Sequence, residues 1–205
     1  MKTKGIDEMS SRKGSSYERE VCTLLSRWWS EGKRDDIFWR SSGSGARATV
    51  RGKKNQKTAG QCGDVCATDP CGEPLIDLLT VEIKRGYSSF SFQDLIDRQE
   101  ASALQWWEKA VEQAIMSHEL AGSFAWLLIV RRDRRVPLVF MPWFLSKTLI
   151  EIGVEVPDDV PEVQMRVEVR DEEKLGDWHT IVGMLLVDFL RIVRPEHVKK
   201  LAKIA

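Results

Sequence analysis

The apolar run LIDLLTV, residues 75–81, continues directly into Glu82-Ile83-Lys84, and we expect this stretch to be a buried strand. Side chains on a strand alternate between the two faces of a sheet, so Glu82 and Lys84 would point to one face and Val81 and Ile83 to the other. The carboxylate and the ammonium group would then lie roughly 6–7 Å apart along the strand. Such a pair suits a hard metal ion and a water molecule activated by it. Glu-x-Lys is also common on solvated strands, so the triplet indicates a metal site only together with its neighbouring segments.

A second acidic residue lies upstream, in Gly63-Asp64-Val65. The segment between, TDPCGEP at residues 68–74, is rich in turn-forming residues. We therefore predict a hairpin, in which a short strand carrying Asp64 turns back into the strand of Glu82. Neighbouring strands lie about 4.8 Å apart, which would bring Asp64 within metal-sharing distance of Glu82. The alternative is that Asp64 only caps a turn.

A third acidic residue, Glu18, falls on the apolar side of a predicted helix. At about 100° per residue, one apolar stripe of this helix is formed by Tyr17, Val21, Leu24, Leu25 and Trp28. Glu18 lies inside the stripe, whereas Glu20 lies outside it and is expected to be a surface residue. A carboxylate facing the core is costly unless it is paired, protonated or bound to a metal. Glu18 is thus a candidate ligand, with a salt bridge to a buried arginine as the alternative.

The segment FWRSSGSG, residues 38–45, predicts a short strand that runs into a hydroxyl-rich loop. From Ile37 through Gly63 the chain has no acidic residue but six basic ones. Such a loop is able to hold a phosphate backbone and release counterions, although a solvated insertion is the alternative. The candidate nucleic-acid contacts are Arg40, Ser41, Ser44, Arg47, Arg51, Lys53, Lys54 and Lys57.

Taken together, these segments resemble the PD-(D/E)XK nuclease superfamily and, within it, the archaeal-type Holliday junction resolvases. The matching strings are RKGSSYERE at 12–20, WRSSGS at 39–44, GDV at 63–65 and VEIK at 81–84, in the order of the family. The chain departs from the compact resolvase pattern in the 18 residues, 46–63, between the Ser-Gly loop and Asp64, and in its continuation to residue 205.

The resemblance implies a Mg²⁺ site, with Mn²⁺ as a substitute. Its ligands would be the carboxylates of Glu18, Asp64 and Glu82, often completed by the backbone carbonyl of Ile83. Lys84 would orient or deprotonate the attacking water. The family's Arg-Ser pair near the scissile phosphate maps to Arg40 and Ser41.

The expected fold is α/β: a restriction-endonuclease-like αβββαβ core with a mixed central sheet flanked by helices, followed by a C-terminal α+β elaboration. Residues 1–142 would form the nuclease core, with a basic loop at 45–62. Residues 143–205 would pack on it as an extension for oligomerisation or substrate selection. Apolar periodicity predicts the elements beyond residue 90: helices near 95–118, 143–152 and from 195, and strands at 122–130, 136–141 and 163–169. Residues 179–193 fit either a strand pair or a buried helix.

The overall composition is neutral in charge. Lys plus Arg and Asp plus Glu each number 31, so any nucleic-acid signal lies in the distribution of charge. No apolar segment has the length of a membrane span and the N-terminus is polar, so the default location is the cytoplasm, or the host-cell cytoplasm for a phage protein. The four cysteines lack zinc-site spacing, and we expect reduced thiols rather than disulfides.

The sequence therefore predicts a Mg²⁺-dependent endodeoxyribonuclease that hydrolyses phosphodiester bonds in duplex or branched DNA, as a homodimer. A structure-selective, Holliday junction resolvase-like activity is the first hypothesis. The alternatives are a restriction-type or nicking nuclease on ordinary duplex, and a catalytically silent nucleic-acid-binding module of the same fold.

Overall fold

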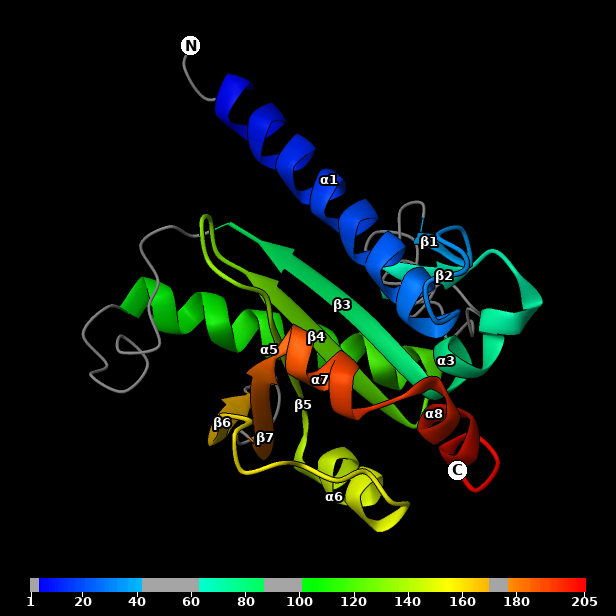
Figure 1. The fold of residues 1–205 in the computed structure, drawn as a ribbon. Coiled ribbons are helices and arrows are strands. Elements are labelled where there is room, and N and C mark those ends of the chain that lie inside the picture. Colours follow the sequence, from blue (N-terminus) through cyan, green and yellow to red (C-terminus); the bar gives the residue numbers. More distant parts are fainter. Residues whose placement is uncertain (1–3, 42–62, 87–100, 170–176) are drawn as a thin grey trace.

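The computed structural model describes the backbone of residues 4–41, 63–86, 101–169 and 177–205, and side chains within 14–41, 63–86, 108–168 and 178–205. Its centre is a five-stranded mixed sheet in the order β3-β4-β5-β7-β6 (Figure 1). β3 and β4 are parallel, and the other neighbours are antiparallel. The strands of this sheet are β3 (Leu79–Arg85), β4 (Ala125–Arg131), β5 (Leu138–Pro142), β6 (Glu162–Val169) and β7 (Asp177–Leu185). This architecture confirms the predicted α/β fold class.

Helices cover both faces of the sheet. The long helix α1 (Lys4–Trp29) and α5 (Ala101–Ala121) lie on opposite sides of β3 in Figure 1. Val81 and Ile83 pack in the core cluster on the α1 side, whereas the side chain of Glu82 contacts α5. The predicted alternation of β3 is therefore confirmed. α5 also supplies the crossover that two parallel neighbouring strands require.

The predicted apolar stripe of α1 is wrong at one position. Tyr17, Val21 and Leu25 are buried, but Leu24 is 41% exposed. The buried face is turned toward Cys22, Leu25 and Trp29, which are all buried, so Leu24 falls at its exposed edge. Glu20 is exposed, as expected, and its carboxylate pairs with Arg131 across 2.6 Å.

The predicted hairpin joining Asp64 to the strand of Glu82 is also wrong. The strand next to Asp64, β2 (Val65–Ala67), pairs in antiparallel fashion with β1 (Phe38–Arg40) in a separate two-stranded sheet. A 3₁₀ turn, η1 (Pro70–Gly72), and a short helix, α3 (Glu73–Leu78), then lead into β3. β1 itself confirms the short strand expected before the hydroxyl-rich loop.

The run at residues 75–81 is therefore not one strand. Residues 75–78 belong to α3 and the strand begins at Leu79. Pro74 stands in the first turn of α3, where its missing amide hydrogen costs nothing, and Leu75 and Leu78 are buried three residues apart on one helix face. A short apolar run fits a helix or a strand equally well by periodicity, and here the preceding proline and the packing decide it.

The last third of the chain extends the same sheet. β7 lies between β5 and β6, and residues 186–192 form α7 (Leu186–Ile192), so the ambiguous stretch holds a strand followed by a helix. The predicted helices at 143 and 195 are α6 (Trp143–Glu151) and α8 (Pro195–Leu201), and β6 confirms the predicted strand. None of the described helices is long and apolar enough to cross a membrane.

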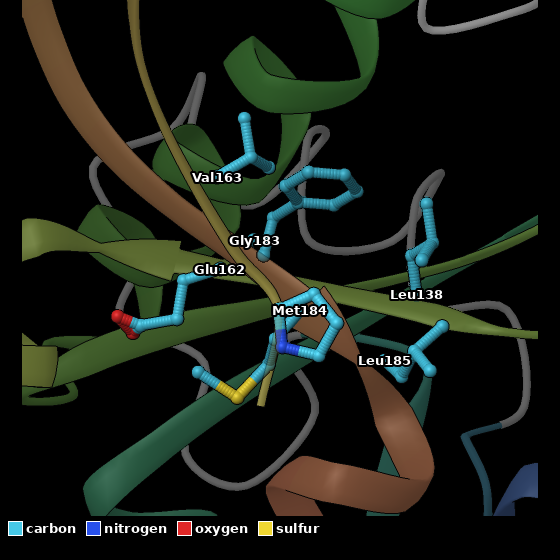
Figure 2. Close-up of a pocket in the computed structure, with 8 residues that line it drawn as sticks. Leu138, Glu162, Val163, Gly183, Met184 and Leu185 are labelled. Atoms are coloured by element: carbon cyan, nitrogen blue, oxygen red, sulfur yellow. The ribbon is translucent and has the colours of Figure 1, made fainter. Parts of the chain in front are cut away.

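The middle of the sheet is tightly packed around Gly183. A methyl group at this position would collide with the ring of Phe140 and press on Val163, so only glycine admits the ring there. An apolar hollow of about 290 Å³ adjoins this contact (Figure 2). Leu138 and Leu185 lie on one side of it, and the carboxylate of Glu162 is directed away from them. The hollow offers apolar contact rather than acid or base chemistry.

Candidate active site

Asp64 is fixed against the outer edge of β3 by two hydrogen bonds. Its backbone N–H donates to the carbonyl oxygen of Val81 across 2.7 Å. Its carboxylate oxygen Oδ2 accepts from the backbone N–H of Ile83 across 2.8 Å. β3 is the edge strand of the large sheet, so these bonds occupy groups that a neighbouring strand would otherwise take. The predicted approach of Asp64 to Glu82 therefore occurs by a route other than a hairpin.

The residue before Asp64 has a backbone that only glycine adopts readily. Gly63 has φ of +80°, and a Cβ atom there would lie 2.8 Å from the carbonyl oxygen of Val81. Ser41, only 8% exposed, holds the same turn: its hydroxyl donates to the Gly63 carbonyl across 2.6 Å, and its amide donates to the Asp64 carbonyl across 3.0 Å. In this arrangement Ser41 positions Asp64 through the backbone.

Glu82 is the most deeply buried acid among the described side chains of the site, at 3% exposure. Lys84 Nζ lies 3.3 Å from its Oε2, and the hydroxyl of Ser117 on α5 donates to its Oε1 across 2.6 Å. Burial, reinforced by the nearby Asp64 charge, raises the pKa of Glu82 to about 7, although Lys84 and Ser117 act in the opposite direction. Glu82 is therefore poised to change protonation near neutral pH.

Glu18 lies between α1 and β1, where it makes a salt bridge. Its Oε2 accepts from Nε of Arg40 across 2.8 Å, and the two side chains are 20% and 33% exposed. A salt bridge to a buried arginine was the alternative to a metal-ligand role for Glu18. The structure shows this salt bridge, and its arginine, Arg40, is half-buried. Cys22, one turn along α1, is buried beside these charges, and its burial raises the thiol pKa to about 12. The thiol is thus neutral and adds no charge to the site.

The carboxylates of the site are engaged by protein groups. Among the described side chains, no three His, Cys, Asp or Glu residues stand close enough together to hold a metal ion as arranged. Asp64 nonetheless lies close enough to Glu82 for its charge to raise the pKa of Glu82. Two hard oxygen donors in mutual repulsion suit a divalent cation such as Mg²⁺. The donor chemistry of Asp64 and Glu82 therefore fits a metal, whereas Glu18 is paired with Arg40.

Several predicted residues lie outside the described part of the chain: Ser44, Arg47, Arg51, Lys53, Lys54 and Lys57. The structure brings together Asp64, Glu82 and Lys84, and places Glu18 and Arg40 beside the same turn. Ser117 was missed from the sequence, because a serine within an amphipathic helix gives no local sign that it faces a strand residue 35 positions upstream.

A mixed sheet between helices, with an aspartate clamped to an edge strand that carries Glu-x-Lys, defines a protein of the PD-(D/E)XK nuclease superfamily. Comparison with known families gives the same class: residues 9–200 match the family described as "Phage putative PDDEXK endonuclease". The chain belongs to this family. No curated protein and no solved structure matches the chain. Family membership supports nuclease activity on nucleic acid, and nucleases of this superfamily generally use divalent metals.

Proposed function

We propose that the protein is a Mg²⁺-dependent DNA endonuclease whose active site contains Asp64, Glu82 and Lys84, with Glu18 as a further ligand. The observation that carries this proposal is the buried Glu82, held between Lys84 and Ser117 with its pKa raised beside Asp64. A structural core would not gain from burying an ionisable group at this edge, whereas a metal-dependent nuclease needs one there.

The residues of the site would have different roles in phosphodiester hydrolysis. Asp64, Glu82 and the carbonyl of Ile83 would hold the metal, which when bound polarises the scissile phosphate and neutralises its developing charge. Lys84, whose side chain is 23% exposed, would orient the attacking water and take its proton or stabilise its negative charge. Ser117 keeps the Glu82 carboxylate turned toward Lys84 by its hydrogen bond.

Glu18 and Arg40 would act as a pair that separates on substrate binding. With the bond of 2.8 Å broken, Arg40 is able to contact a phosphate and Glu18 is released toward Asp64. Both side chains are partly exposed, so the exchange does not bury an unpaired charge. Arg51, Lys54 and the other basic residues of 45–62 would extend the phosphate contacts.

The preferred substrate is branched DNA, by the resolvase-like motif order, and the protein would act as a homodimer. The test is to incubate the protein with plasmid, linear duplex, single-stranded and four-way-junction DNA, each with Mg²⁺ or EDTA. We expect cleavage that needs Mg²⁺ and is fastest on the junction. Cleavage of plain duplex at the same rate would favour the restriction-type or nicking alternative.

Variants link the activity to the site. Asp64→Ala, Glu82→Ala and Lys84→Ala should each lower the rate by at least roughly 100-fold while DNA binding persists. Lys109→Ala, an exposed lysine on α5, is the matched control and should keep full activity. Binding without any cleavage in the wild type would instead support the catalytically silent module.

The basic loop has its own test. Changing Arg51 and Lys54 to Ala should weaken DNA binding and flatten its dependence on salt, because fewer counterions are released. If the affinity for DNA and its dependence on salt are unchanged, the loop is a solvated insertion that does not contact DNA.

A further inference from the structure

A cleft of about 340 Å³ opens where α5 ends, between β4, β5, α6 and β7. Its volume lies at the lower end of the roughly 300–1,000 Å³ range of pockets for small ligands. Its lining is unusually aromatic and includes His118, Trp126, Trp143, Phe144, Trp178 and His179.

Three of these aromatic side chains are exposed to solvent. Trp143 is 38% exposed, Phe144 is 45% exposed and Trp178 is 57% exposed. Gathered exposed aromatic surface is uncommon on a protein that does not use it. Phe144 is fixed from behind by an edge-on contact with Phe124, at 5.6 Å between ring centroids. Phe144 is therefore held in place by this contact.

The cleft opens on the face of the sheet that α5 covers, which is also the face of the Glu82 side chain. Trp126, 3% exposed, is a buried part of its lining and pairs with Thr80, two residues before Glu82 on β3. From strand geometry the Cα atoms of Trp126 and Glu82 are about 8 Å apart. On α5, Ser117 donates to Glu82 and the next residue, His118, lines the cleft. The exposed ring of Trp178 lies farther away. Glu82 is level with Gly183, three strands across the sheet, and Trp178 is five residues before Gly183, so the Cα atoms of Glu82 and Trp178 are roughly 20 Å apart. Several nucleotides of a single strand would span this distance.

The charges around the cleft favour an uncharged, flat ligand. Glu119 lines it and would repel a phosphate inside. Lys147, by contrast, lies with Nζ 4.2 Å from the ring centroid of Trp143, where it is able to meet a phosphate outside the cleft. A nucleobase stacked on aromatic rings with its backbone beside a cation matches both features.

From these contacts we infer that the cleft binds unpaired bases of the substrate, several nucleotides away from the scissile phosphate. The inference rests on the proposed nuclease function and narrows its substrate. Bases within a duplex are already stacked and paired, so only an overhang, flap or branch point offers them freely. The cleft would thus favour branched or tailed DNA over continuous duplex.

The test compares binding of three labelled DNAs in EDTA, where no cleavage occurs: a blunt duplex, the same duplex with an unpaired tail, and the single strand. Trp178→Ala should lower the affinity for the tailed duplex and for the single strand by at least about fivefold, and Trp143→Ala should lower both affinities as well. The blunt duplex should keep its affinity. Trp178→Phe, which retains a ring, should restore most of the lost binding. Val187→Ala, exposed on α7, is the control and should change nothing.

An equal loss on all three DNAs, or no loss on any, would overturn the inference and leave the cleft for another ligand, such as a peptide. The nuclease proposal is judged separately, by cleavage of a duplex with Mg²⁺. Cleavage that depends on Lys84 together with no tail-specific effect of Trp178→Ala refutes the cleft alone. A tail-specific effect in a protein that cuts nothing refutes the nuclease and keeps the cleft as a base-binding site.

Discussion

Replacing Glu82 with glutamine should make the metal-free protein more stable in mildly alkaline solution. Glu82 is 3% exposed, and burial followed by the Asp64 charge raises its pKa from 4.5 to about 7. The folded protein therefore holds a proton that the unfolded chain releases from about pH 4.5 upward. The contribution of Glu82 to the free energy of unfolding is fully present below pH 4.5 and is lost as the pH rises toward and through 7.

The size of the loss follows from the two pKa values. One pKa unit corresponds to about 1.4 kcal/mol, so Glu82 should lower the free energy of unfolding by about 2.5 kcal/mol between pH 5 and pH 8. In Glu82→Gln this contribution disappears. The side-chain oxygen of glutamine still accepts from Ser117, so the packing against α5 is preserved.

Urea unfolding in EDTA at pH 5 and pH 8 measures the effect. Wild type should lose about 2.5 kcal/mol more than Glu82→Gln over this interval. Glu162→Gln, an exposed acid on β6, is the matched control and should behave as wild type. Mg²⁺ should recover part of the loss in wild type at pH 8 but not in Glu82→Gln. Parallel pH profiles for wild type and Glu82→Gln would refute the argument that Glu82 is buried at a cost.

Three further predictions concern the groups around Glu82. Ser117→Ala removes a hydrogen bond to the ionised carboxylate, so the pKa of Glu82 should rise further and the pH profile of cleavage should move up by about one unit. Gly63→Ala combines a left-handed backbone with a contact of 2.8 Å, and should cost about 1–3 kcal/mol in urea unfolding and displace Asp64, lowering the cleavage rate. Glu18→Gln should raise the Mg²⁺ concentration needed for half-maximal cleavage if Glu18 is a ligand; an unchanged requirement would leave it as a structural ion pair.

Local chemistry was sufficient to predict the superfamily and the approach of Asp64 to Glu82 and Lys84. The order of the Glu, Asp and Glu-x-Lys segments indicated the superfamily, because carboxylates and a lysine needed at one metal leave recognisable strings. The alternation of β3 was also predictable, since a strand side chain has only two faces. β4 was predictable from its continuous apolar run, and β6 from its alternating pattern.

Tertiary packing decided the rest. Residues 75–78 form a helix, although the same leucines would suit a strand, because Pro74 and the burial of Leu75 and Leu78 favour the helical turn. Asp64 reaches β3 by a backbone clamp rather than a hairpin. Leu24 is left at the exposed edge because the buried face of α1 is turned toward Cys22 and Trp29.

The sequence by itself determined which acids and which lysine this protein carries and that their order is typical of one nuclease superfamily. Only the tertiary structure decided that Glu82 meets Ser117, that Glu18 pairs with Arg40, and that an aromatic cleft opens between α5, α6 and β7. The reason is physical: a residue's type and its alternation along a strand are local properties. Its burial, its pKa and its partners depend on which distant segment is packed against it.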